Sequence, residues 1–127
     1  MSKDSKECVF CKIRDIDMAL KNDLCFAIYD SFPVSSGHML IIPFRHFDNF
    51  FECTEEEIAS VWDLLQKCKK MLADDLKPAG FNIGVNIGEI SGQTIFHTHL
   101  HLIPRYVGDI DDPRGGIRGV IPEKRIY

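Results

Sequence analysis

Apolar and polar residues follow two patterns along the 127-residue chain, one typical of strands and one typical of a helix. Two short apolar runs, at 25–29 and 38–42, predict buried strands, and Pro43 ends the second run. At 81–87 apolar residues alternate with Asn and Gly, which predicts a strand with one apolar face. His, Thr and Leu alternate at 97–105 and predict a fourth strand, joined to the third by a short glycine-containing hairpin turn.

A long helix is predicted between these two pairs of strands. Thr54 and Glu57 have the spacing of a capping box, in which each side chain binds the backbone N–H of the other residue. Apolar residues then recur at helical spacing as far as Leu76. We expect the helix to cover 55–75 and to end before Pro78.

The order of these elements indicates the fold class. Two strands, a long helix and two further strands are typical of an α+β fold with an antiparallel sheet. We expect about five strands packed with the long helix and with a short N-terminal helix at 12–17. The chain is interpreted as a single domain over 1–127, with residues 1–7 disordered and 106–127 forming a C-terminal tail.

Composition and charge narrow the class of protein. Hydrophobic residues make up 45% of the chain and charged residues 27%, which are ordinary globular values. A net charge of −4 argues against broad nucleic-acid binding. We expect a cytoplasmic, intracellular protein without a membrane partner, because the polar N-terminus does not resemble a secretory signal and no apolar run has the length of a membrane span.

Three of the five histidines lie in the last alternating segment. Read as a strand, this segment places His97, His99 and His101 on one face and Thr and Leu on the other. Such a row is compatible with an exposed polar face, or with a zinc site that uses two histidines. It is also compatible with covalent chemistry, because a neutral imidazole is a good nucleophile for a phosphoryl or nucleotidyl group.

The cysteines suggest a metal site near the N-terminus. Five is an odd number, and Cys8 and Cys11 form a C-x-x-C pair. In an intracellular protein this pair indicates either a metal site or two free thiols. Cys25, Cys53 and Cys68 are expected to pack as small apolar residues.

These features together are similar to a known family. His-x-His-x-His followed by two apolar residues resembles the signature of the histidine-triad (HIT) superfamily. The resemblance extends over roughly 8–105 and includes Gly92-Gln93-Thr94, Gly37-His38 and Asp30. Pro104-Arg105, directly after the triad, is more similar to the dinucleotide-hydrolase branch and its bacterial relatives than to the phosphoramidase branch.

The resemblance implies a reaction and a class of substrate. It implies hydrolysis or transfer at the α-phosphate of a purine nucleotide conjugate, through a nucleotidyl-histidine intermediate, with release of a nucleoside monophosphate such as AMP. Dinucleoside polyphosphates are the first expected substrates. Nucleoside phosphoramidates are the alternative substrates, and a non-enzymatic nucleotide-binding regulatory protein is the alternative function. The resemblance also implies a homodimer, and a nuclear as well as cytoplasmic location in a eukaryote.

The resemblance assigns roles to individual residues. His99 is expected to be the nucleophile, His101 to contact the phosphate and assist the leaving group, and His38 to orient the triad. The carboxylate of Asp30 suits the ribose hydroxyls because it only accepts hydrogen bonds. The expected nucleotide-binding residues, besides His99 and His101, are Asp30, Asn86, Gln93, Thr94, Phe10, Ile13 and Ile28, of which the last three are equally compatible with a core role.

The resemblance also completes the metal site. It implies that Cys8, Cys11, His46 and His97 hold a structural zinc ion, and it implies no organic cofactor. Surface or subunit-interface charge is the simpler interpretation of Arg105, Arg114 and Arg118, and substrate contact is the alternative.

Overall fold

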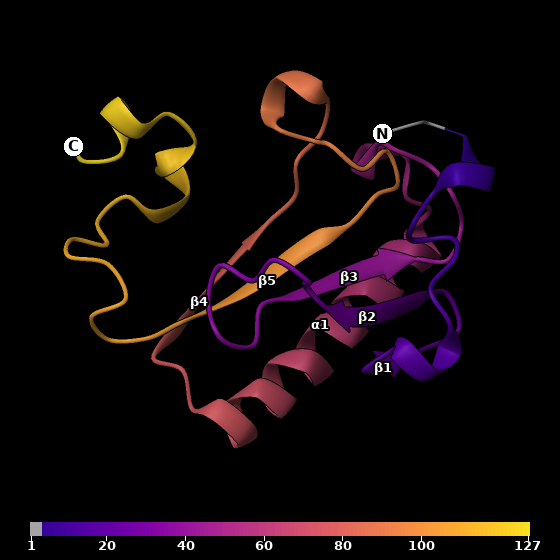
Figure 1. Ribbon diagram of the computed structural model, residues 1–127, viewed down its shortest axis with the longest axis horizontal. Helices are drawn as coiled ribbons and strands as arrows, with labels where there is room; N and C mark the ends of the chain where they lie inside the picture. The colour runs from indigo at the N-terminus through magenta and orange to yellow at the C-terminus, as the bar shows by residue number, and fades with distance from the viewer. Residues whose placement is uncertain (1–3) are drawn as a thin grey trace.

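The computed structural model describes residues 4–127 and contains one antiparallel sheet with a single α-helix on one face (Figure 1). The order of strands in the sheet is β1-β2-β3-β5-β4. The elements are β1 (Leu20–Lys21), β2 (Cys25–Tyr29), β3 (Met39–Pro43), α1 (Glu55–Leu76), β4 (Gly80–Gly84) and β5 (Leu100–Arg105). The predicted α+β class is therefore confirmed. In the described part of the chain, no helix is both long and apolar enough to cross a membrane.

The ends of α1 agree with the helix signals in the sequence. Thr54 Oγ1 accepts a hydrogen bond from the Glu57 backbone N–H at 3.1 Å, and Glu57 Oε1 accepts one from the Thr54 N–H at 2.9 Å. This capping box satisfies backbone donors that have no partner inside the helix. Lys77 ends the helix in the left-handed conformation, with φ of 51°. The predicted helix over 55–75 is confirmed to within one residue.

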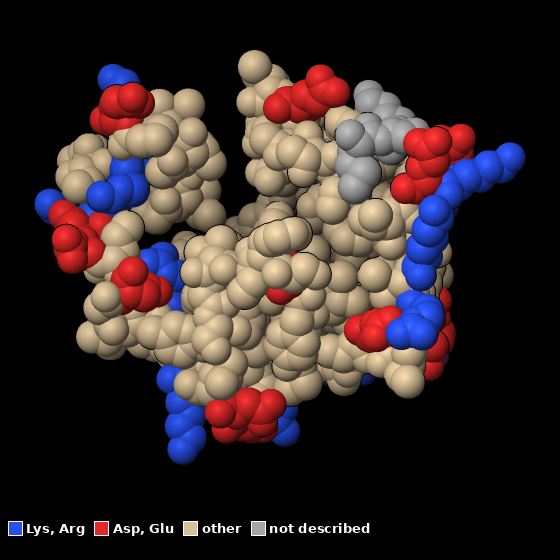
Figure 2. All heavy atoms as spheres, viewed as in Figure 1, with Lys and Arg blue, Asp and Glu red and all other residues tan. Residues whose placement is uncertain are grey.

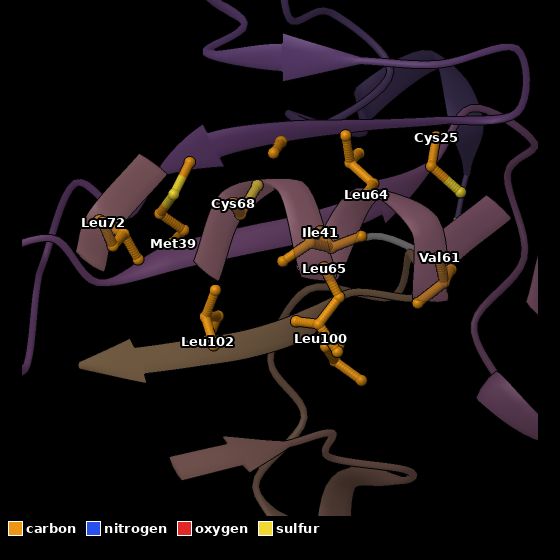
Figure 3. Packing of buried hydrophobic residues seen from close by; sticks show 11 residues of the cluster. Cys25, Met39, Ile41, Val61, Leu64, Leu65, Cys68, Leu72, Leu100 and Leu102 are labelled. Carbon is orange, nitrogen blue, oxygen red and sulfur yellow. The ribbon is translucent and has the colours of Figure 1, made fainter. Parts of the chain in front are cut away.

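The main core lies between α1 and the face of the sheet that the helix covers (Figure 3). Apolar residues of the helix at i, i+3, i+4 and i+7 face alternate residues of the strands. The members of this core include Met39, Ile41, Leu64, Leu65, Leu72, Leu100 and Leu102, with Cys25 and Cys68 as small apolar residues. A second cluster occupies the opposite face and comprises Cys8, Phe10, Phe26, Ile28, Leu40 and Ile42. The second face is left open for a site.

The predicted histidine strand is shorter in the structure than in the sequence pattern. β5 begins at Leu100, so only His101 of the three alternating histidines belongs to it. The Thr98 N–H donates to the carbonyl of Phe47 at 2.6 Å, and Thr98 Oγ1 donates to the same carbonyl at 2.9 Å. These bonds attach the chain to the loop after β3 instead of to a neighbouring strand.

The expected hairpin between the last two strands is also corrected. β4 and β5 are antiparallel neighbours, with Gly84 opposite His101, but residues 85–99 connect them instead of a short turn. The strand predicted over 81–87 ends at Gly84. Gly88 has φ of 90° and precedes a 3-10 turn at Glu89–Ser91, which leads the chain away from the sheet.

Short 3-10 elements occur in both terminal segments. Residues 1–3 of the segment expected to be disordered lie outside the described residues, whereas Ser5–Glu7 form a 3-10 helix. The short helix expected at 12–17 is a 3-10 turn at Asp15–Asp17. The C-terminal segment, yellow in Figure 1, contains 3-10 turns at Gly116–Val120 and Pro122–Lys124 and lies beside β4.

Candidate active site and metal site

The sheet brings three functional candidates together at the ends of neighbouring strands. Asp30 follows β2 and His38 precedes β3, and the Asp30 N–H donates to the His38 carbonyl at 2.9 Å. His101 lies opposite Leu40 in the pairing of β3 with β5. The Nε2 atom of His38 is 2.9 Å from His101 Nδ1 and 3.5 Å from Asp30 Oδ2.

The hydrogen bond of His99 determines which of its nitrogens is free. His99 Nδ1 lies 2.8 Å from the carbonyl oxygen of His97, which can only accept, so Nδ1 carries the proton. In a neutral imidazole the lone pair is then on Nε2. The ring is 8% exposed, and the edge of Phe10 packs against it with centroids 5.1 Å apart. His99 is thus held as a neutral base with one available nitrogen.

Burial keeps these imidazoles uncharged. Desolvation lowers the pKa of His38, His99 and His101 below the ordinary value of 6.5. The negative charge of Asp30 raises the pKa of each of them, but this effect is smaller than desolvation. At neutral pH the neutral form therefore predominates in all three rings, and it is the form that a nucleophilic imidazole requires.

A cavity of about 530 Å³ opens in front of His99 and His101. Its apolar end contains Phe10, Ile13 and Ile28, and its polar end contains Asp30, Asn86 and Thr94 with the two imidazoles. Phe10 and Ile28 also belong to the second core cluster, so they have a core role, and their contact with a nucleotide stays a prediction. Gly92, part of the Gly92-Gln93-Thr94 motif, also lines the cavity, and sequence reasoning missed the remaining lining residues, which are Val9, Ser31, Phe32, Leu40 and Ile95.

The described residues that line this cavity include no Lys or Arg. On the face seen in Figure 2, blue side chains lie toward the edges, and the middle is tan apart from a small red patch. Arg105 instead forms a bidentate pair with Asp109 and donates to Asn82 Oδ1, and Arg114 pairs with Asp112. These arginines brace the C-terminal segment.

Gln93, expected among the nucleotide-binding residues, has backbone partners in the surrounding loops. Its Oε1 atom accepts from the Gly88 N–H at 2.9 Å, and its Nε2 donates to the carbonyls of Asp48 and Ile95. The side chain is buried and does not line the cavity. Gln93 therefore holds the loop between β4 and β5 in position, whereas its neighbours Gly92 and Thr94 reach the site.

A second group of side chains forms a compact cluster beside the site. The ligand atoms of Cys8, Cys11, His46 and His97 all lie within 4.8 Å of one another. Cys8 and Cys11 come from the N-terminal C-x-x-C segment, His46 from the loop after β3 and His97 from the segment before β5. These are the four residues that the resemblance implied. The distances between pairs of these atoms allow a test of which metal they fit.

The cluster has the dimensions of a tetrahedral zinc site. With Zn–N of about 2.05 Å and Zn–S of about 2.3 Å, N and S ligands are about 3.5 Å apart and two N ligands about 3.3 Å apart. The Nδ1 of His97 is 3.4 and 3.5 Å from the sulfurs of Cys8 and Cys11, and 3.2 Å from His46 Nδ1. His97 Nε2 donates to the Pro43 carbonyl at 2.7 Å, which leaves the Nδ1 lone pair for a metal. The residues fit zinc.

Burial changes the pKa of two residues in the cluster. Desolvation, with a smaller effect of the neighbouring Cys8, raises the pKa of the Cys11 thiol to about 11. A zinc ion would displace this proton, since the thiolate is the form that binds metal. Desolvation also lowers the pKa of His97, which favours the neutral, ligating imidazole.

One functional group had no signal in the sequence. The backbone N–H of Val34 donates to His38 Nδ1 at 3.0 Å. Any residue except proline supplies such a group, so no residue type marks it. Phe32 had a weak sequence signal, because it is a large apolar residue two positions after Asp30 in a loop.

The chain matches the HIT domain family over residues 14–108. It is 39% identical over 103 residues to adenylylsulfatase HINT3 of Arabidopsis thaliana, a match covering 78% of this chain and 52% of that protein. It is 30% identical over 90 residues to AP-4-A phosphorylase of Mycobacterium tuberculosis, covering 70% of this chain and 46% of that protein. Each of these matches covers only about half of the relative.

A solved structure is similar over most of both chains. The crystal structure of a Zn-bound histidine triad family protein from Mycobacterium smegmatis has a TM-score of 0.73 and 31% sequence identity. The similarity covers 84% of this chain and 80% of that one. A zinc ion is thus bound by a protein of the same fold.

Proposed function

Since the chain belongs to the HIT domain family, we propose that it is a hydrolase that cleaves nucleotide conjugates at the α-phosphate and releases a nucleoside monophosphate. The hydrogen bond between His99 Nδ1 and the His97 carbonyl carries this proposal. It directs the lone pair of Nε2 away from the backbone, next to the cavity that His99 lines. A buried, neutral imidazole in this state is suited to attack phosphorus.

The reaction proceeds in two steps at His99. In the first step Nε2 forms a bond to the α-phosphorus, and the bond to the leaving group breaks. The nucleotidyl imidazolium that results carries a positive charge, which the His97 carbonyl stabilises through the Nδ1–H. In the second step water attacks phosphorus, the P–N bond breaks, and the proton of the water passes to solvent. Positioning and charge stabilisation supply most of the catalysis.

The remaining lining residues position the nucleotide. The purine base occupies the apolar end, between Phe10 and the side chains of Ile13 and Ile28. Asp30 accepts from the ribose hydroxyls, while its Oδ1 also accepts from the Phe32 N–H at 2.9 Å. The hydroxyl of Thr94 and the amide of Asn86 bind phosphate oxygens, and Gln93 contributes by holding the loop that carries Thr94. His101 donates to the phosphate, and His38 orients His101.

Dinucleoside polyphosphates are the first proposed substrates, and nucleoside phosphoramidates are the alternative. AP-4-A phosphorylase among the relatives supports the first class. Because no Lys or Arg lines the cavity among the described residues, a polyphosphate leaving group would bring its own counterions, such as Mg²⁺. A protein that only binds nucleotides is the outcome if no turnover is found with either class.

We also propose a structural zinc ion and a homodimer. Zinc held by Cys8, Cys11, His46 and His97 would supply a fixed cross-link between three segments of chain, one of which leads to His99. The homodimer interface would use the exposed face of α1, where Trp62 is 59% and Ile58 44% exposed. Exposed large apolar side chains of this kind are typical of protein contacts.

The test is replacement of His99 by Asn. The variant and the wild type are assayed for AMP release from a dinucleoside polyphosphate and from a fluorogenic adenosine phosphoramidate. We expect loss of turnover and of the covalent adenylyl-enzyme, which acid quenching and intact-protein mass spectrometry detect in the wild type. Every histidine of the chain lies in one of the two sites, so no histidine outside them is available for a control variant. Zinc content and thermal unfolding therefore serve as controls for folding. Undiminished turnover in the variant would refute the proposal.

A further inference from the structure

The segment from Cys8 to Cys11 belongs to two sites at once. Its two cysteines are part of the zinc-sized cluster, in which their sulfur atoms lie within 4.8 Å of each other. The two residues between the cysteines, Val9 and Phe10, line the cavity in front of His99. A displacement of either cysteine therefore also displaces a wall of the cavity.

The ring of Phe10 connects the cluster with the proposed nucleophile. It is 5% exposed, and it meets the imidazoles of His97 and His99 at angles of 85° and 69°, with centroids 5.9 and 5.1 Å apart. The carbonyl of Phe10 accepts a hydrogen bond from the Ile13 N–H at 3.4 Å, and Ile13 lines the same cavity. The shape of the turn between the cysteines thus determines where two cavity residues lie.

The two cysteines of the cluster differ in their access to solvent. Among the described residues, Cys11 is the only exposed cysteine, whereas Cys53 is half-buried and Cys8, Cys25 and Cys68 are buried. The thiolate is the form that reacts with oxidants, and a cysteine that binds zinc must be a thiolate. Cys11 therefore combines the reactive form with access to solvent, and Cys8 lies beside it as a second thiolate.

We propose that Cys8 and Cys11 are a redox-sensitive pair, and that their oxidation by a hydroperoxide releases the zinc ion and withdraws Phe10 from the cavity. This regulation rests on the proposed function of the cavity as a nucleotide site. In the first step the Cys11 thiolate attacks hydrogen peroxide, the O–O bond breaks, and a sulfenic acid and hydroxide form. In the second step the Cys8 thiolate attacks the Cys11 sulfur, the S–O bond breaks, and a disulfide and a second hydroxide form. The two thiolates lose two electrons, and the peroxide, with two protons from solvent, becomes two waters.

The disulfide removes two of the four metal ligands. Its sulfur atoms are no longer thiolates, and His46 and His97 alone do not complete a tetrahedral zinc site. Two sulfurs bound to one zinc ion are about 3.8 Å apart, whereas bonded sulfurs are about 2 Å apart. The turn that carries Phe10 must therefore tighten. Reduction by a dithiol, followed by zinc, reverses both changes.

The test uses the full chain, reduced and loaded with zinc. Hydrogen peroxide is added in steps, and three quantities are measured: zinc released to a chromogenic chelator, disulfide formation by peptide mass spectrometry, and the Kd for AMP by calorimetry. We expect one zinc ion released per disulfide formed between Cys8 and Cys11. The Kd for AMP should rise by about tenfold or more, as expected for loss of an aromatic contact with the base. Dithiothreitol with zinc should restore the initial Kd.

Controls separate oxidation from loss of the metal. Reduced protein stripped with a chelator should recover AMP affinity on addition of zinc alone, whereas oxidised protein should need a reductant as well. Cys11→Asp supplies a carboxylate to the metal but leaves Cys8 without a disulfide partner, so zinc bound by this variant should stay bound in peroxide. Cys53→Ser, outside the cluster, should respond as the wild type does. The wild-type measurements do not depend on folding of either variant.

The outcomes distinguish this regulation from the proposed function. Zinc retained by the wild type in excess peroxide, or oxidation of Cys11 without a disulfide to Cys8, would overturn the redox pair. An equal Kd for AMP in the reduced and oxidised protein would overturn its link to the cavity. If the reduced protein neither binds AMP nor turns over nucleotide conjugates, the proposed function fails, while zinc release and disulfide formation still decide whether the pair is redox-sensitive.

Discussion

Replacement of Gly37 by Ala should destabilise the fold and displace His38. Gly37 precedes His38 and has φ of 90°, a conformation that costs an L-residue about 1–2 kcal/mol. A Cβ atom here would lie 2.7 Å from Leu76 Cδ1 and 2.9 Å from Leu72 Cδ2. Both side chains belong to the C-terminal part of α1, where Leu72 is buried and Leu76 is partly exposed, and overpacking against them costs roughly 1–3 kcal/mol. We expect a loss of about 2–5 kcal/mol in the free energy of unfolding.

Gly108 provides the matched comparison. It has φ of 82°, but no atom lies within 4 Å of its Cβ position. Gly108→Ala should therefore lose only the backbone cost of about 1–2 kcal/mol. Urea unfolding of both variants, analysed by linear extrapolation, measures the two losses. If both variants lose the same free energy, the contact between Gly37 and α1 does not have the importance assigned to it.

Relief of the clash should also affect turnover. Either α1 moves away or the start of β3 moves, and the second response shifts His38 from its bonds to Val34 and His101. We expect kcat to fall in Gly37→Ala and to remain near wild type in Gly108→Ala. Equal kcat in the two variants would show that the helix absorbs the whole displacement.

Three further predictions follow from charge, metal and surface. Burial lowers the pKa of His38 and His101 below 6.5, so the unfolded chain binds protons before the folded chain does as the pH falls. The free energy of unfolding, measured by urea titration from pH 8 to 5, should therefore be constant above about pH 6.5 and should decrease below it. An increase below pH 6.5 would contradict the lowered pKa values. Cys11→Ser should reduce the amount of zinc per chain and lower the unfolding temperature, whereas Cys53→Ser, outside the cluster, should leave the zinc content unchanged. Plasma mass spectrometry measures zinc in both variants, and equal zinc contents would count against the site. Trp62→Glu should convert the proposed dimer to monomer in sedimentation velocity, and an unchanged sedimentation coefficient would exclude this face of α1 as the interface.

The strands and helix of the core were predictable from local signals. The apolar run at 25–29 is β2, and the capping residue Thr54 marks the start of α1. Both predictions worked because burial on one face and satisfaction of the first N–H groups are local requirements. The two-residue strand β1, Leu20–Lys21, carried too short a pattern to be detected.

The path of the chain around the site was less predictable. Alternation of His97, Thr98 and His99 suggested one continuous strand, but Thr98 found its partner in the Phe47 carbonyl, a contact between distant segments. Gln93 was expected among the nucleotide-binding residues because of its place in a motif, and in the structure its side-chain amide forms hydrogen bonds with three backbone groups of the surrounding loops. Choices of this kind depend on which backbone groups come near, and a sequence pattern does not contain that information.

The metal site illustrates the difference between residue type and placement. C-x-x-C suggested a metal, but only the family resemblance supplied His46 and His97 as partners. The structure brings the four ligand atoms to zinc-like separations. The sequence signal for His46 and His97 was that the chain has only five histidines, all of which are placed in the two sites.

Backbone groups at the far side of the rings decide the proton positions of the imidazoles in these sites. The Val34 N–H does so for His38, the His97 carbonyl for His99, and the Pro43 carbonyl for His97. Side chains in these loops can therefore be exchanged without altering the reactive nitrogens, provided that the path of the main chain is kept. Substitutions of the side chains that line the cavity can therefore change which substrate binds, while the backbone hydrogen bonds keep the reactive nitrogens unchanged.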